Sequence, residues 1–284
     1  MGTSTRASDT SKRRGVPLAN HAARAGFLIV GALVLAAVAA DWLPLRSPVL
    51  MAPQSRMAGP SWAMPFGADA FGRDLLSRTV YGARLSLEVA FASVVAALAA
   101  GTLLGLTAGY AGGRMDQVLM RAMDVFFSFP TVLLALGIVA ALGPSPQNVT
   151  LAIAIVYTPI FARVVRGPVL ALKEREFVEA TRALGAPAPR IVGRHILPNL
   201  GSVLVVQASI ALSWAILTEA SLSFLGLSAQ PPAPSWGAML NEGRQNLELA
   251  PHLAIFPGLA IMLAVLGFNL LGDGLRDALD PRGR

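Results

Sequence analysis

The chain has 284 residues, of which 54% are hydrophobic and only 14% charged, and its mean hydropathy of +0.59 is far too high for a soluble domain of this length. The net charge of +7 does not indicate a nucleic-acid-binding surface, because the cations lie around the ends of apolar runs and are not interleaved with aromatic residues. Cysteine is absent, which excludes disulfides, thiol catalysis and Cys-based metal sites, and the three histidines are too scattered for a local metal motif.

The N-terminal 25 residues are basic and rich in Ser and Thr, which predicts a disordered tail. An apolar run follows at 26–45, and its part 26–40 ends in small residues, as a cleaved signal peptide would. We favour an uncleaved membrane anchor.

Six stretches are apolar and long enough to cross a bilayer, which takes about 20 residues. They are 26–45, 85–110, 120–142, 149–170, 202–224 and 252–272. The sequence therefore predicts an all-α membrane protein with six transmembrane helices and both termini on one side. We expect the first to be an anchor and 85–272 to form a five-helix core, with a C-terminal tail at 273–284.

The distribution of Lys and Arg predicts the orientation. Seventeen cations fall in the two tails and in the second and fourth loops, whereas six fall in the first and fifth loops. Both termini are therefore expected in the cytoplasm. The first loop, 46–84, would lie outside, with a Pro-rich part and an amphipathic segment at 69–81. The outer fifth loop carries Pro231, Pro232, Pro234 and Trp236, and either receives a binding protein or covers a channel mouth.

Two kinds of residue inside the spans have structural meaning. Glycines recur at four-residue spacing on the second span and predict close helix packing: Gly101, Gly105 and Gly109. Prolines inside three spans remove backbone hydrogen bonds and predict kinks: Pro130, Pro159 and Pro257.

Ionisable residues in the spans are few, and lipid exposure of such groups is costly. We expect Glu88 to pair with Arg84, and Asp124 with Arg121, because each pair is three or four residues apart on a helix. Glu219 has no such partner on its own helix. It is a candidate for the translocation path or for a contact between subunits.

A charged segment, 171–199, separates the fourth and fifth spans. Its spacing predicts a helix over 173–184 that Gly185 ends as a C-terminal cap, and two prolines at 187 and 189 then prevent its continuation. A second short helix is expected at 190–197. A helix-turn-helix with a stripe of charge at a membrane surface suits a soluble partner better than a substrate.

This segment resembles the coupling loop of bacterial ATP-binding-cassette importer permeases, whose pattern is Glu-Ala-Ala, three residues, Gly, nine residues, Ile-x-Leu-Pro. Thr181 replaces the second Ala and His195 stands where Ile is usual. The resemblance implies that the coupling to an ATPase is carried by Glu179, Ala180, Thr181, Arg182, Gly185, His195, Leu197 and Pro198.

Three further stretches, 66–78, 221–237 and 269–277, resemble the C-type permease of dipeptide, oligopeptide and nickel importers, so the likeness covers roughly 26–282. Departures are Met64 where His is frequent, Ala68 for Thr and Ser228 for Gly. The resemblance implies a type I importer transmembrane domain in the bacterial inner membrane. Its partners would be a homologous second permease, two ATP-binding subunits and an extracytoplasmic solute-binding protein, and its cargo short peptides or, as the alternative, nickel chelates.

The chain has no phosphate-binding loop of its own. The only lysines, Lys12 and Lys173, do not follow the glycines that a Walker A loop requires. ATP and Mg²⁺ would therefore be used by a separate subunit, and we expect this chain to bind no cofactor or metal and to have no catalytic residue. An intramembrane hydrolase would need a base or paired aspartates at membrane depth, which the spans lack. An ion-driven secondary transporter is the remaining alternative.

Overall fold

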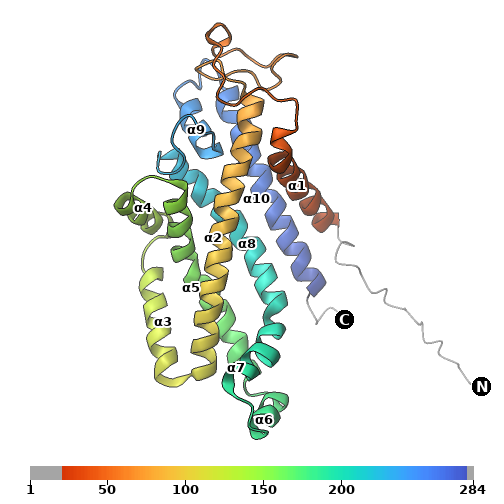
Figure 1. Ribbon diagram of the computed structural model, residues 1–284, viewed down its shortest axis with the longest axis vertical. Helices are drawn as coiled ribbons and strands as arrows, with labels where there is room; N and C mark the ends of the chain where they lie inside the picture. Colours follow the sequence, from red (N-terminus) through yellow and green to blue (C-terminus); the bar gives the residue numbers. More distant parts are fainter. Residues whose placement is uncertain (1–20, 280–284) are drawn as a thin grey trace, which may run out of the picture.

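A computed structural model of the chain describes residues 21–279, and these form a helical protein whose only other regular structure is two isolated β-bridges in the first loop. Five of its helical segments are long and apolar enough to cross a membrane (Figure 1): 21–41, 75–111, 146–172, 188–224 and 252–279. A bent pair of shorter helices supplies a sixth candidate. This arrangement agrees with the predicted fold class.

The main helices in chain order are α1 (His21–Val38), α2 (Leu75–Ala111), α3 (Gly113–Phe127), α4 (Thr131–Leu142), α5 (Pro146–Leu172), α6 (Glu176–Ala183), α7 (Ala188–Ile191), α8 (Gly201–Phe224), α9 (Trp236–Arg244) and α10 (His252–Leu279). The first twenty residues, where most of the expected tail falls, lie outside the described part of the chain. Helix α1 begins within the rest of that tail, and α10 continues to Leu279 through most of the expected C-terminal tail.

The expected third span is not one straight helix. Helices α3 and α4 meet at 89° across Ser128, Phe129 and Pro130. Pro130 has no N–H to donate and disfavours the helical conformation at Phe129, so α3 ends before it. By contrast Pro159 and Pro257 lie inside α5 and α10, which continue past them. Among the three prolines, the helix therefore breaks at Pro130.

The second span also differs from its expected bounds, because α2 begins at Leu75 instead of residue 85. The Asp74 side chain accepts a hydrogen bond from the Ser77 backbone N–H at 2.8 Å and caps the helix. The segment 69–81, expected as one amphipathic helix, therefore consists of a capping turn and the first turns of α2. The 37 residues of α2 exceed what a bilayer core requires, so its capped end projects beyond the apolar layer.

The glycines of the second span form the contact between α2 and α5, as predicted. A Cβ at Gly105 would lie 2.7 Å from the Cβ of Val165, and one at Gly109 would lie 2.8 Å from the Cβ of Val169. One at Gly101 would collide with Phe161. The missing side chains let the two backbones approach closely, and the resulting seam runs along the centre of the protein.

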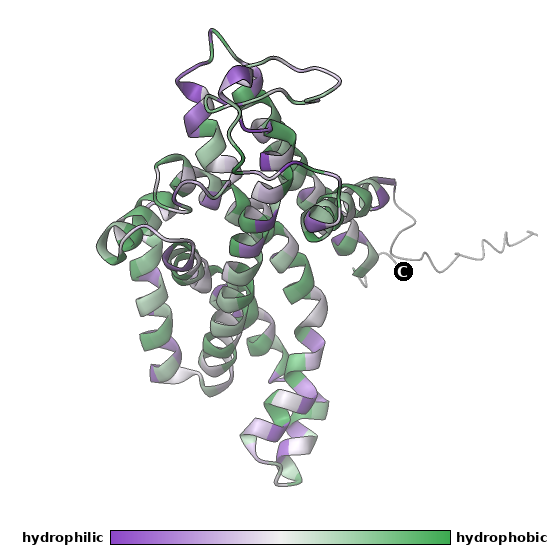
Figure 2. Ribbon diagram, turned by 45° about the horizontal axis from the view of Figure 1, so that its top comes forward, coloured by the Kyte–Doolittle hydropathy of each residue, from purple (hydrophilic) through white to green (hydrophobic). Residues whose placement is uncertain are grey.

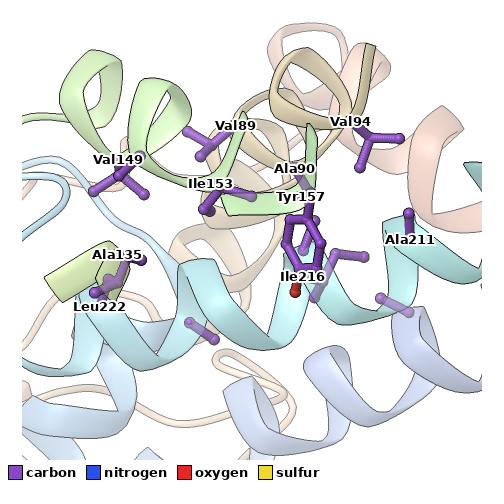
Figure 3. Packing of buried hydrophobic residues seen from close by; sticks show 14 of the residues in the cluster. Val89, Ala90, Val94, Ala135, Val149, Ile153, Tyr157, Ala211, Ile216 and Leu222 are labelled. Atoms are coloured by element: carbon purple, nitrogen blue, oxygen red, sulfur yellow. The ribbon is translucent and has the colours of Figure 1, made fainter. Parts of the chain in front are cut away.

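The main core joins α2, α4, α5, α8 and α10 (Figure 3). Tyr157 of α5 lies between α2 and α8, and its hydroxyl forms a 3.0 Å hydrogen bond with the Thr218 hydroxyl. Helix α1 packs against α10 through small residues, since a Cβ at Gly26 would lie 2.5 Å from the Leu271 nitrogen. The first loop and α9 lie at one end of the protein, and α6 and α7 at the other (Figure 1).

Candidate functional site

The segment with the resemblance to a coupling loop forms a short helix-turn-helix at one tip of the protein. Helix α6 starts at Glu176, three residues later than predicted, because the chain turns at 173–175 after α5. It carries Glu179, Ala180, Thr181 and Arg182 as its fourth to seventh residues. Figure 2 shows hydrophilic residues gathered at this tip, whereas hydrophobic residues follow the long helices.

Gly185 ends α6 as predicted. It has φ of +79°, and its N–H donates to the Arg182 carbonyl at 2.9 Å while the Ala186 N–H donates to the Thr181 carbonyl at 3.3 Å. These two bonds define a Schellman cap, in which the left-handed residue is usually glycine. A Cβ at Gly185 would meet no atom within 4 Å, so backbone strain, and not steric overlap, selects glycine here.

The second half of the element is less regular than the single helix expected at 190–197. After α7 the chain forms a π-turn over Val192–Ile196 and a 3₁₀ turn over Leu197–Leu200. Pro198 has no N–H to donate to the Arg194 carbonyl, so the α-helical ladder cannot continue through it. Leu197 and Pro198 are exposed on this turn, at the start of α8.

The two residues that depart from the coupling-loop pattern, Thr181 and His195, both make contacts within the element. The Thr181 hydroxyl donates to the Phe177 carbonyl at 2.7 Å, which keeps it within its own helix. The ring of His195 lies 6.4 Å from that of Phe177, so the two halves of the element touch at this pair. Neither substitution disturbs the helix-turn-helix.

A second hydrophobic cluster joins this element to the long helices. It contains Val178, Ile191 and Ile196 of the element, each at most 1% exposed, together with Leu106 of α2 and buried valines of α5. The Arg182 guanidinium also lies 6.0 Å from the ring of Tyr110 at the end of α2. The element is therefore packed as one body with the ends of α2, α5 and α8.

Leu184 is a candidate contact residue that the sequence analysis missed. It occupies the C-cap of α6 and is 88% exposed, which leaves an apolar side chain at the very tip. A cavity of about 520 Å³ lies beside the element, lined by Tyr110, Ala111, Lys173, Glu174, Arg182 and Ala188. The sequence signal for Leu184 was its position directly before Gly185. At such a C-terminal cap the chain turns away from the helices against which α6 packs.

Glu219 does not lie on an open surface. Its side chain is fully buried between α8 and the loop that follows, and its Oε1 accepts a hydrogen bond from the Ser228 hydroxyl at 3.3 Å. Its second carboxylate oxygen, Oε2, is buried without a hydrogen-bond partner among the described residues, and its expected role in the path or in a subunit contact stays a prediction. The partner Ser228 lies in a loop nine residues away, which helix spacing alone does not reveal.

The expected helical ion pairs are replaced by pairs between elements. Arg84 binds Asp41 at 3.0 Å and not Glu88, and Asp124 binds Arg163 at 2.6 Å and not Arg121. Both predictions were wrong because they considered neighbours on one helix only, whereas the partners come from the 3₁₀ turn after α1 and from α5.

The first loop and α9 are held together by an ionic network around two buried arginines. Arg73 binds Asp69 at 2.6 Å and Glu242 of α9 at 3.0 Å, and Arg78 reaches the same two carboxylates at 3.3 and 3.2 Å. Both arginines are at most 3% exposed. Trp236, which we had considered for a binding surface or a cover, is also buried.

The Trp236 indole N–H donates to the Thr79 carbonyl at 2.9 Å and ties α9 to α2. The aromatic residue of the fifth loop therefore stabilises the outer end from within. Exposed aromatic residues at this end are Trp42, Trp62 and Phe71, and the side chain of Trp62 has no protein cover.

Known proteins with similar sequences are transport permeases. The chain is 50% identical over 263 residues to a dipeptide transport system permease protein, DppC, of Alkalihalophilus pseudofirmus, covering 93% of this chain and 86% of that protein. It is 53% identical over 224 residues to a glutathione transport system permease protein, GsiD, of Pectobacterium atrosepticum, covering 79% and 74%.

The fold has a relative among solved structures, a chain of the MetNI methionine ABC transporter in inward-facing conformations. The TM-score is 0.57 at 22% identity, over 72% of this chain and 98% of that chain. This likeness confirms the predicted fold of a type I importer transmembrane domain. The family model described as "Binding-protein-dependent transport system inner membrane component" matches residues 101–284. The chain therefore belongs to this family of multi-pass membrane proteins and is a permease subunit of an ATP-binding-cassette importer.

Proposed function

We propose that this permease carries short peptides, and that the α6–α7 element receives the motion of a separate ATP-hydrolysing subunit. The observation that supports the second part is the combination of an exposed, charged and apolar tip with a buried base. Glu179, Arg182 and Leu184 face outward, while Val178 and Ile191 are packed against the long helices. A force on the tip would thus reach α2, α5 and α8 without bending the element.

In this proposal ATP and Mg²⁺ are bound by two partner subunits, and a homologous second permease completes the pathway. Closure of the ATP-binding subunits would draw the two coupling elements together and turn the cavity outward. An extracytoplasmic solute-binding protein would then deliver the cargo. The cation distribution supports a cytoplasmic location for this element and for both termini.

The docking part is tested by two exposed leucines at opposite ends of the protein. Leu184 is 88% exposed at the α6 tip and Leu249 is 80% exposed in the outer loop. In the assembled transporter, Leu184→Asp should lower co-purification of the ATPase subunit, because it places a charge in the apolar contact. Leu249→Asp is the matched control. Equal ATPase recovery with both variants would refute the docking surface.

Two relatives support the peptide cargo, since one bears the name of a dipeptide system and the other that of a glutathione system, and glutathione is a tripeptide. The test is ligand binding by the partner solute-binding protein, with peptide libraries against nickel chelates. Peptide binding is expected. Tight binding of a nickel chelate with no peptide affinity would contradict the peptide assignment and leave the permease assignment unchanged.

A further inference from the structure

Two ion pairs line a groove between α3 and α5, away from the coupling element and from the outer network. Asp116 and Asp124 of α3 face Arg166 and Arg163 of α5, respectively. The groove has a volume of about 970 Å³, and the side chains of Gln117 and Arg121 also line it. Its wall thus offers charges of both signs.

The Arg163–Asp124 pair lies within two segments that qualify as membrane spans, α5 and the bent α3–α4 pair. Asp124 is 11 residues from the start of α3 and Arg163 is nine residues from the end of α5, at the side of the coupling element. At 1.5 Å per residue these separations place the pair about 15 Å along the helices from that end.

This pair is also half-exposed. The side chains of Arg163 and Asp124 are 45% and 47% exposed, and Val118 on the same helix is 65% exposed. Charged groups within a membrane span usually face protein or water, because their transfer into hydrocarbon costs several kcal/mol. The α3–α5 face must therefore look onto water or onto protein.

The two ion pairs differ in geometry, and the difference leaves one of them with hydrogen-bonding groups for a ligand. Arg166 donates two hydrogen bonds to the Asp116 carboxylate, at 2.5 and 2.6 Å, and the Asp116 side chain is only 14% exposed. Arg163 donates a single bond to Asp124 Oδ1, at 2.6 Å, and its guanidinium lies 3.9 Å from the ring of Phe127. The Arg163–Asp124 pair thus retains an acceptor oxygen and several N–H donors for a ligand.

We propose that the α3–α5 groove lines the translocation path, and that Arg163 and Asp124 exchange their mutual bond for the carboxylate and ammonium ends of a passing peptide. This proposal rests on the proposed peptide cargo. A zwitterion supplies a carboxylate for Arg163 and an ammonium for Asp124. Both residues therefore remain paired when their mutual bond opens. Arg166 and Asp116 hold the rest of the groove in shape.

The absence of cysteine allows a direct test of exposure. Single variants Gln117→Cys and Val118→Cys, in the transporter assembled in inside-out vesicles, are treated with a charged methanethiosulfonate reagent. Leu103→Cys on α2 is the matched control, since Leu103 is 66% exposed and lies at a similar depth. We expect modification of both groove positions and not of the control.

Resistance of both groove positions would mean that a partner subunit covers the face, and would overturn the proposal. Equal modification of Leu103→Cys would overturn it as well, because reactivity would then not follow the groove. This labelling does not depend on the cargo. If the wild-type transporter moves no peptide, the proposed cargo fails while the labelling still decides whether the groove is open.

The role of the pair is tested by peptide uptake into proteoliposomes that hold the complete transporter and its binding protein. Arg163→Gln and Asp124→Asn should each lower the maximal uptake rate about tenfold, with an unchanged half-saturating concentration, because the binding protein still captures the peptide. Arg163→Lys should retain more activity. Arg84→Gln, at the comparably exposed Arg84–Asp41 pair, is the control. Wild-type rates in both groove variants would refute the role of the pair.

Discussion

The two ends of this permease use their charged residues in opposite ways. At the end formed by the first loop and α9, Asp69, Arg73 and Arg78 are at most 3% exposed and bind one another and Glu242. At the inner end Glu179 and Arg182 are exposed on α6. Charges that are buried and mutually paired fix loops in place, whereas charges left on a rigid tip are available to a partner.

The largest expected effect comes from the outer network. Asp69→Ala removes the carboxylate that both arginines contact and leaves buried cations with Glu242 alone, which should lower the free energy of unfolding by about 3–5 kcal/mol. Glu179→Ala should change it by less than about 0.5 kcal/mol, because its side chain is exposed. Thermal unfolding of the purified protein in detergent measures both. Equal losses would abolish the contrast between the two ends.

The seam that connects the two ends gives the next effect. Gly105→Val places carbon atoms against Val165 and the Ala162 carbonyl, which should cost about 1–3 kcal/mol through overpacking. Gly137→Val on α4 is the control, since a Cβ there meets nothing within 4 Å. The same unfolding assay applies, and ATPase activity shows whether coupling falls as well. Similar stability of the two variants would contradict tight packing at the seam.

A smaller effect is expected within the coupling element. Gly185→Ala should cost about 1–2 kcal/mol locally, since a side chain at φ of +79° is strained. Gly193→Ala is matched, because a Cβ at either glycine meets no atom within 4 Å and Gly193 has no positive φ. Hydrogen exchange of α6 and peptide-stimulated ATPase activity are the readouts. Unchanged exchange in Gly185→Ala would remove the cap as the reason for this glycine.

The smallest effect belongs to the exposed Arg84–Asp41 pair. Asp41→Asn should alter stability least of these variants, because exposed ion pairs contribute little. Salt sharpens the comparison, since screening should weaken this pair more than the buried Asp69 network. The experiment is a salt titration of the unfolding temperature of wild type and of Asp41→Asn. A loss as large as that of Asp69→Ala would show that burial does not separate the two ion pairs.

The sequence by itself determined the features that depend on local chemistry. Apolar length gave the membrane helices, four-residue spacing gave the glycine seam, and Gly185 gave the end of α6. The residues proposed for coupling lie close together in the chain, so a single sequence pattern was enough to indicate them through its resemblance to a known loop. Each of these signals acts over one or two turns, where backbone geometry fixes which residues meet.

Only the tertiary structure decided which charges meet. Asp124 pairs with Arg163 of α5, and Arg84 pairs with Asp41 beyond α1. Glu219 accepts a hydrogen bond from Ser228 in a loop. The tertiary structure also turned one expected span into two helices at Pro130 and buried Trp236. A side chain reaches only a few ångströms, so its partner depends on how separate helices pack, and helix spacing along one segment does not contain that information.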